Sequence, residues 1–222
     1  YVRRSEASCT HCTFSDTSDT PVYVEAGALV LTDSVVENVS GNAIVAVQGS
    51  SVSLEDVAFR DVAEAAIIAH EAASTALRNV DIDAGSGVLI SNAGGSNAIE
   101  ETRIVARKDV ALQLEGDGNS TIRDSRLESV NTGLIAILRN SASVRISDTT
   151  AIGPAGAVYM EGSEGTTHAL SIEDSLLLAT GEKTYALRLF RTSADIAKNV
   201  LLSSGNGVYV GEDAGANLGE NI

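Results

Sequence analysis

Residues 31–36 are LTDSVV, and this hexad decides the fold because the chain repeats it at a nearly constant interval. An aliphatic residue opens each copy, an acidic or amide residue follows two positions later, and a second apolar residue usually closes it. Further copies are residues 54–59 (LEDVAF), 77–82 (LRNVDI), 99–104 (IEETRI), 122–127 (IRDSRL), 146–151 (ISDTTA) and 172–177 (IEDSLL). A repeat of this length indicates a solenoid, in which each unit stacks on the one before it.

The third position of the hexad gives a register for the whole chain. Its residues are Asp33, Asp56, Asn79, Glu101, Asp124, Asp148, Asp174, Asn199 and Asn221, at spacings of 22–26 residues. Apolar and polar residues alternate within the copies, as they do in strands, instead of recurring every three or four residues as in an amphipathic helix. The sequence therefore predicts an all-β parallel β-helix of about nine coils, with a period of 22–26 residues.

Alternation also assigns side chains to the interior of the coils. One expected inward stack is Leu31, Leu54, Leu77, Ile99, Ile122, Ile146 and Ile172. A second is Val36, Phe59, Ile82, Ile104, Leu127, Ala151 and Leu177, and a third is Ile44, Ile67, Val88, Leu134, Val158 and Val208. Because one core runs the length of the rod, we expect a single domain over residues 1–222. The chain begins with Tyr1, so we interpret it as a segment of a larger or processed protein.

This repeat resembles those of the right-handed parallel β-helix superfamily, the pectate-lyase-like group, over nearly the whole chain. An acidic turn, then glycine and alternating valine, tyrosine and alanine, is similar to the β-helix regions of large secreted or surface proteins of bacteria. The resemblance implies a single-stranded right-handed parallel β-helix and an extracellular or cell-surface location. The superfamily includes polysaccharide lyases and hydrolases, phage tailspikes and adhesins, so fold alone does not decide function.

The charge of the chain excludes some classes of partner. Its 222 residues carry a formal net charge of −15, and the 30 acidic residues are spread along the sequence. Nucleic acid and anionic membranes need clustered Lys and Arg, so neither is expected as a partner. No run approaches the ~18 apolar residues of a membrane helix, so we expect no membrane insertion. The simplest interpretation of the charge is solubility and the suppression of edge-to-edge association.

Basic residues gather in the middle coils, where they provide the only candidates for catalysis. Arg103 and Arg126 occupy equivalent outward positions and should stack, with Asp124 and Asp148 nearby. An enzyme of this fold would need acidic groups and a cation in one groove, as in a polysaccharide lyase or hydrolase. The alternative is a solvated face on which these charges pair with one another.

An outward apolar column is the strongest candidate for binding. Its expected members, one from most coils, are Tyr23, Val45, Ile68, Leu89, Ile135, Tyr159 and Tyr209, with Arg188 and either Gln113 or Ala111 in the remaining places. The column predicts a surface covered by a protein partner, a neighbouring chain or the rest of the parent protein. Carbohydrate is a second class of partner. The alternative is ordinary β-propensity, because Val, Ile and Tyr suit strands whichever way they point.

The repeated acidic position predicts turns whose backbone N–H groups are bonded by Asp or Asn side chains. No cofactor is expected, although Asp56, Asp81 and Asp83 would suit Ca²⁺, which takes carboxylate oxygens.

Cys9 and Cys12 fall at inward positions of the first coil, and they would form a disulfide if the protein is exported. With His11 they lack the remaining ligands of a zinc site. We expect His70 and His168 to face solvent.

Two hypotheses about function follow from these features. The first is a non-catalytic structural or interaction module, a stalk or an adhesin-like binding face, in a secreted or cell-surface protein. The second is a carbohydrate-active enzyme, or a module that binds acidic polysaccharide, using the middle coils.

Overall fold

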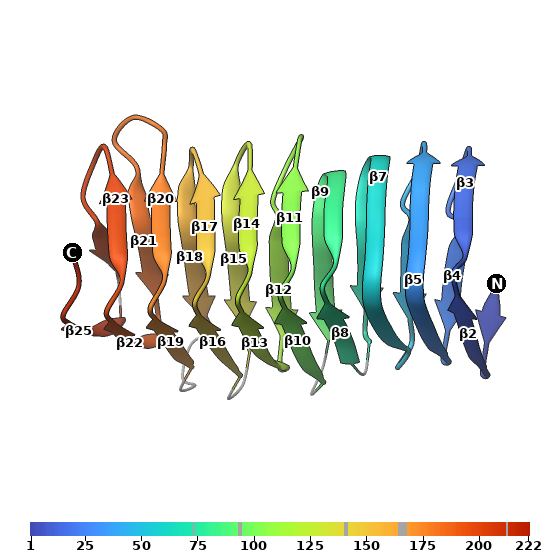
Figure 1. Cartoon of the computed structure of the whole chain (residues 1–222). Coiled ribbons are helices and arrows are strands. Elements are labelled where there is room, and N and C mark those ends of the chain that lie inside the picture. The colour runs from blue at the N-terminus through green and yellow to red at the C-terminus, as the bar shows by residue number, and fades with distance from the viewer. Residues whose placement is uncertain (73, 93–94, 140–141, 164–167, 212) are drawn as a thin grey trace.

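The computed structural model of this chain describes residues 1–72, 74–92, 95–139, 142–163, 168–211 and 213–222. Within these ranges there are 25 strands, and their pairings are parallel. The strands stack into a β-solenoid of about nine turns, with coils side by side along one axis and the termini at opposite ends (Figure 1). These ranges contain no helix that could span a membrane. The predicted all-β solenoid is therefore confirmed.

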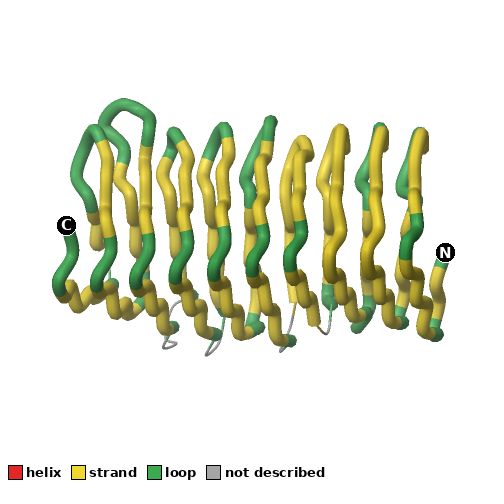
Figure 2. Tube along the Cα trace, in the orientation of Figure 1, coloured by secondary structure: helices red, strands yellow, loops and turns green. Residues whose placement is uncertain are grey.

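Each coil contributes a strand to three sheets, which we call sheets I, II and III in chain order. The long strands β5 (Ala28–Val39), β7 (Ser51–His70) and β9 (Asp81–Asn92) bend round corners and pair within more than one sheet. Figure 2 shows strands and loops recurring at matching heights in successive coils. Equivalent residues therefore form columns along the rod.

Sheet I consists of β2 (Glu6–Thr10), the first parts of β5 and β7, β8 (Ser74–Arg78), β10 (Ser96–Glu100), β13 (Asn119–Arg123), β16 (Ser143–Ser147), β19 (Ala169–Glu173), β22 (Ser193–Ala197) and β25 (Gly215–Gly219). Sheet II consists of β3 (Thr13–Thr17), later parts of β5 and β7, the first part of β9, β11 (Arg103–Ala106), β14 (Arg126–Ser129), β17 (Thr150–Gly153), β20 (Leu176–Ala179) and β23 (Val200–Ser203). Sheet III consists of β1 (Val2–Arg3), β4 (Val22–Glu25), β6 (Ile44–Val47), the ends of β7 and β9, β12 (Leu112–Gly116), β15 (Thr132–Leu138), β18 (Gly156–Gly162), β21 (Tyr185–Phe190) and β24 (Val208–Val210).

A single residue in the left-handed backbone conformation makes the corner between sheets I and II in each coil. These corner residues, with φ between +48° and +57°, are His11, Asp33, Asp56, Asn79, Glu101, Asp124, Asp148, Asp174, Lys198 and Glu220. Most L-residues avoid this conformation because Cβ approaches the next carbonyl oxygen, and Asp and Asn tolerate it best. The repeated acidic or amide position in the sequence therefore marks this corner.

The predicted register is wrong by one residue in the last two coils. Lys198 and Glu220 occupy the corner there, whereas Asn199 and Asn221 come one position later. Asn199 is only 1% exposed, and its side-chain oxygen accepts a hydrogen bond from the backbone amide of Ser175 at 2.9 Å. An asparagine can thus occupy the interior because its amide bonds the backbone groups that it meets there.

Just inside the corner, most coils place a buried Ser, Thr or Asn. Ser125 donates to the carbonyl of Arg123 (2.7 Å) and accepts the backbone N–H of Thr102, one coil earlier (3.2 Å). Ser175 likewise accepts the N–H of Thr149 at 3.1 Å. The inner hydroxyl, and not the corner carboxylate as we expected, therefore satisfies these buried amides. Buried backbone amides need such partners because leaving one unpaired is costly.

The aliphatic stacks fill the interior as predicted. All members of the first two stacks are at most 1% exposed, and so are the members of the third up to Val158. Val208, in the last coil, is only partly buried. At the turn before sheet III, a Cβ on Gly87 would overlap the carbonyl oxygen of Ala111, so this close approach requires glycine.

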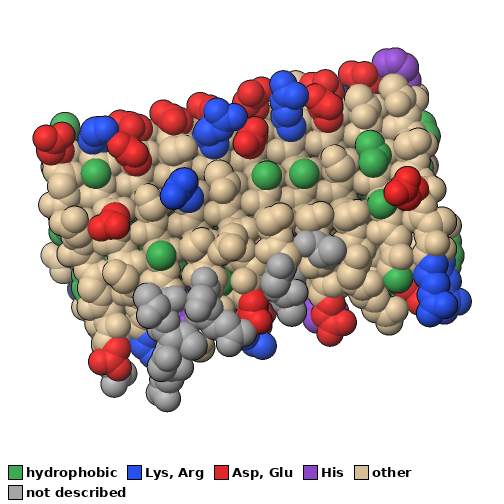
Figure 3. Space-filling view, turned by 90° about the horizontal axis from the view of Figure 1, so that it is seen from below, with side chains coloured by type: hydrophobic (Ala, Val, Ile, Leu, Met, Phe, Trp, Pro, Cys, Tyr) green, Lys and Arg blue, Asp and Glu red, His purple; other side chains and the backbone are tan. Residues whose placement is uncertain are grey.

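The outer face of sheet I is lined mainly by small polar side chains. Figure 3 views the molecule from this side and shows charged side chains gathered along one long edge. One outward column alternates in charge, with Arg78 bonded to Glu55 (3.0 Å) and Arg123 to Glu100 (3.1 Å). This face carries no large apolar column.

We expect Ile122→Ala to lower the free energy of unfolding by about 2–5 kcal/mol, because the cavity left in the stack has no other atoms to fill it. The matched control is Thr121→Ala, an exposed position on the same strand, which should change it by less than about 0.5 kcal/mol. Urea unfolding followed by circular dichroism measures both. Equal losses in the two variants would contradict the assigned register.

The corner gives a second prediction, at Asp33, whose φ is +49°. Asp33→Val should destabilise the chain by about 1–2 kcal/mol, because a β-branched residue is strained in this conformation. Asp33→Gly should be tolerated, since glycine adopts positive φ without that strain. If valine were tolerated as well as glycine in urea unfolding, the corner would not limit stability.

Candidate functional site

The outer face of sheet III carries the predicted apolar column in direct register. The paired residues, coil by coil, are Tyr23, Val45, Ile68, Leu89, Gln113, Ile135, Tyr159, Arg188 and Tyr209. Gln113 fills the position that the sequence left open, whereas Ala111 is buried. Most of these side chains are half-buried and Tyr209 is exposed, so the column forms one continuous surface that we call the sheet III stripe.

The C-terminal end of the stripe is an aromatic cluster around one arginine. The Arg188 guanidinium carbon lies 5.5–5.9 Å from the ring centres of Tyr159, Tyr185, Phe190 and Tyr209. The rings also contact one another, with Phe190 and Tyr209 centres 5.4 Å apart. Cation–π attraction at these distances holds the guanidinium among the rings. We call this group the aromatic cage.

A pocket of about 340 Å³ opens beside the cage. Its lining comprises Asn131, Thr132, Ile135, Ile137, Ala155, Gly156, Val158, Tyr159, Glu161 and Arg188. Glu161 accepts the hydroxyl hydrogen bond of Tyr159 (2.6 Å) and pairs with Arg191. Burial, and then this bond to Glu161, raise the pKa of Tyr159 to about 12, so its hydroxyl remains a donor at neutral pH. The pocket therefore combines an apolar wall, a phenol and a cation.

Three of the four predicted catalytic candidates, Arg103, Arg126 and Asp124, lie beside oppositely charged side chains. Arg103 and Arg126 are opposite each other on β11 and β14, as the sequence predicted. Arg103 bonds Asp81 (2.8 Å), and Arg126 bonds Glu128 (2.7 Å). Asp124 lies at the corner, 3.6 Å from the Arg123 Nε. This arrangement matches a salt-bridged face better than a prepared acid–base pair.

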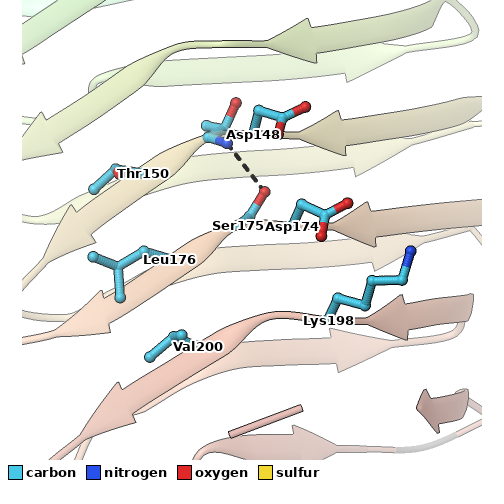
Figure 4. A pocket seen from close by; sticks show the side chains of 8 residues that line it. Asp148, Thr150, Asp174, Ser175, Leu176, Lys198 and Val200 are labelled. Carbon is cyan, nitrogen blue, oxygen red and sulfur yellow. Dashed lines mark hydrogen bonds between the residues drawn. The ribbon is translucent and has the colours of Figure 1, made fainter. Parts of the chain in front are cut away.

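Asp148 lines a different pocket, of about 400 Å³, at the corner of three consecutive coils. The lining residues are Asp148, Thr149, Thr150, Asp174, Ser175, Leu176, Lys198 and Val200. In Figure 4 the corner residues Asp148, Asp174 and Lys198 form one row, and Thr150, Leu176 and Val200 form a second row on sheet II. Lys198 bonds Glu173 at 2.7 Å, which lowers the pKa of Glu173 and raises that of Lys198. We call this the corner pocket.

The three carboxylates suggested for Ca²⁺ are not arranged as a cluster. Asp56 accepts a hydrogen bond from the Asn79 side chain, Asp81 bonds Arg103, and Asp83 lies 3.1 Å from Arg107. Within the described ranges, no group of three or more His, Cys, Asp or Glu side chains is placed to hold a metal ion.

The two cysteines form a disulfide in the first coil, with their Cα atoms 6.0 Å apart. Cys9 pairs in register with Leu31, and the amide of Cys12 donates to the hydroxyl of Ser34 (3.1 Å). Both cysteines therefore follow the inward columns that the sequence assigned to them.

Comparison with protein families identifies the repeat. The family described as right-handed β-helix region matches residues 1–170. The chain belongs to this family. No curated protein and no solved structure matches it. The family assignment agrees with the predicted right-handed parallel β-helix and does not name a ligand or reaction.

One histidine of the β-helix lies where the sequence did not predict it. His168 is 1% exposed, not solvent-facing, and its Nε2 accepts the backbone N–H of Ser163 at 3.0 Å. A Cβ on Gly162 would collide with the imidazole ring, so glycine makes room for it. Burial lowers the pKa of His168, and the neutral ring is the form that accepts this hydrogen bond. His70, by contrast, is exposed as expected.

Sequence reasoning also missed parts of both pockets. The aromatic cage takes Tyr185 and Phe190 from positions beside the stripe, which alternation within one column does not connect. On sheet II, Leu176, Leu178 and Leu202 face outward, although this face is charged in the middle coils. Following each outward column over all coils would have revealed this change from charged to apolar residues.

The buried histidine makes stability depend on pH in a defined direction. The pKa of His168 in the folded chain lies below the ordinary value of 6.5. As the pH falls below 6.5, this histidine is therefore protonated in the unfolded chain but stays neutral in the folded chain. The free energy of unfolding should therefore fall between pH 7 and about pH 5, and His168→Gln should flatten that slope. The matched control, His70→Gln, should retain it. Urea unfolding across this range provides the measurement, and an unchanged slope in His168→Gln would contradict the assignment.

Proposed function

We propose that this β-helix is a non-catalytic interaction module whose binding face is the outer surface of sheet III. The observation that carries the proposal is the sheet III stripe, in which apolar or aromatic side chains stack in register over nearly all coils. Sheet I offers no such column, so β-propensity alone does not explain the difference between the faces. A continuous apolar surface of this kind suits a macromolecular partner.

The regular stacking of coils also suits a structural role, as a stalk, besides the role in binding. Each coil packs against its neighbours through the inward stacks, and one buried cluster extends from Val22 to Ile196. A rod built this way holds its outward columns at fixed spacing, as a stalk or an adhesin-like face requires. The partner is a protein, a neighbouring chain or another part of the parent protein, with carbohydrate as the second class.

We further propose that the module belongs to a secreted or cell-surface protein, bacterial in origin. The Cys9–Cys12 disulfide supports export, because disulfides persist in oxidising compartments and are rare in the cytosol. The acidic surface is compatible with this location but does not require it.

The carbohydrate-active alternative keeps one favourable observation, the in-register pair Arg103 and Arg126 with Asp124 beside them. Their bonds to Asp81 and Glu128 weigh against it, because a catalytic groove needs groups aimed at a substrate. Release of unsaturated or reducing ends from uronate polymers by the purified chain would overturn the non-catalytic proposal.

A photo-crosslinking amino acid tests the binding face directly. Placed at Ile68 or Ile135 in the protein's native host, it should give adducts of higher mass, because the stripe is covered by its partner. The matched controls are Ala76 and Thr121, exposed outward positions on sheet I, which should give none. Mass spectrometry distinguishes a second copy, another protein and carbohydrate. Adducts at equal yield on both faces, or on neither, would contradict the proposal.

A further inference from the structure

Arg188 contacts aromatic rings, whereas many other arginines of the chain contact a carboxylate. Surface arginines typically bond a carboxylate, as Arg139 bonds Glu115 (2.7 Å) and Arg78 bonds Glu55 (3.0 Å). Arg188 is half-buried, and among the described residues it forms no ion pair with a carboxylate. Its Nε is buried without a hydrogen-bond partner in the same part of the chain. The Nε of Arg188 therefore lacks an acceptor, and no described side chain bonds the rest of its guanidinium.

The aromatic cage does not remove that need. Aromatic rings attract a cation through their faces, but they provide no oxygen for the in-plane N–H donors of a guanidinium. The cage also fixes the side chain in place. Gly211 lies against Phe190, and a Cβ there would come within 2.5 Å of the ring, so the packing around the cage is close. Arg188 is thus held in one position with its donors incompletely used.

The nearest carboxylate in the pocket is already occupied. Glu161 binds the Tyr159 hydroxyl and pairs with Arg191, so it is not the missing partner of Arg188. The apolar part of the wall includes Ile135 and Ile137, outward on β15, and Tyr159 on β18, and Asn131 and Thr132 add polar groups. Gly156 has no side chain to fill the space. A ligand here would therefore contact both apolar side chains and the Arg188 cation.

We propose that this pocket, the Arg188 pocket, binds a carboxylate group attached to an apolar or aromatic body. A carboxylate matches the planar guanidinium, which can bond both of its oxygens, and the body would lie on Ile135 and Tyr159. The volume of about 340 Å³ accommodates one side chain or one small molecule. The inference rests on the proposed function, because it gives the sheet III face the chemistry of its ligand.

The charge of the whole chain makes this binding specific. A protein with a net charge of −15 repels anions at long range, so an anion that binds must do so through a local site. A neutral analogue of the same shape would lose the guanidinium bonds while keeping the apolar contacts. Comparing the two isolates the contribution of Arg188.

The test is a titration of the chain with phenylacetate and with the neutral phenylacetamide, followed by nuclear magnetic resonance shifts of residues around the pocket. Phenylacetate should bind about tenfold or more tightly than phenylacetamide, as expected for a charge-assisted hydrogen bond. Arg188→Gln should remove this preference, and Arg139→Gln, directly after β15, should retain it. A capped dipeptide of phenylalanine and glutamate forms a second arm. Tighter binding of the dipeptide identifies an acidic side chain of a protein partner, and tighter binding of phenylacetate identifies a small molecule.

Equal affinity for phenylacetate and phenylacetamide overturns the inference without needing any variant to fold. The inference is also overturned if neither phenylacetate nor the dipeptide binds, or if folded Arg188→Gln keeps the preference for phenylacetate over phenylacetamide. Ile135 belongs to the pocket lining, whereas the other crosslinking position, Ile68, lies outside it. Adducts there with no carboxylate binding would refute the Arg188 pocket alone, whereas carboxylate binding with no adducts would refute the interaction face alone.

Discussion

The corner between sheets I and II is the constraint on which the rest of the structure depends. One residue per coil turns the chain by adopting a left-handed conformation. That conformation selects Asp and Asn, and it fixes where the inward stacks of both flanking strands begin. Leu31 and Val36 lie on either side of Asp33, and this arrangement recurs through the rod. Regular columns on the outer surface are a consequence of that fixed corner.

Regular columns determine how chemistry can be arranged on this protein. Residues of one outward column lie next to the equivalent residues of adjacent coils, so neighbouring charges are either complementary or repulsive. On sheet I, repulsion between like charges is avoided because Glu and Arg alternate along one column. In the middle coils of sheet II, Arg103 pairs with Asp81. The sheet III stripe instead collects apolar and aromatic residues in most coils, and Arg188 brings a charge into this column toward the C-terminal end. The aromatic cage forms where this cation meets the aromatic side chains of neighbouring coils.

Much of this architecture could be predicted from the sequence, because the corner leaves an acidic or amide residue in most coils. The inward stacks and the order of the sheet III stripe followed from that repeated residue and from alternation. The register failed at Asn199, since an amide side chain suits both a left-handed corner and the buried position beside it. His168 was misplaced because its burial depends on space left by Gly162, which no pattern of alternation reports. The aromatic cage combines neighbouring columns, and a single-column analysis does not connect them.

The inner hydroxyl column has a direction along the chain. The amide of Cys12 is satisfied by Ser34, that of Thr149 by Ser175, and that of Asn199 by Asn221, so each acceptor comes from the following coil. During synthesis, a coil emerging from the ribosome would have its corner amide completed only when its successor arrives. Where this bond is present, the amide of one coil therefore depends on the coil that follows it. Val57 and Val80 occupy the equivalent position and have no side-chain acceptor, so the series of hydrogen bonds is interrupted at these two coils.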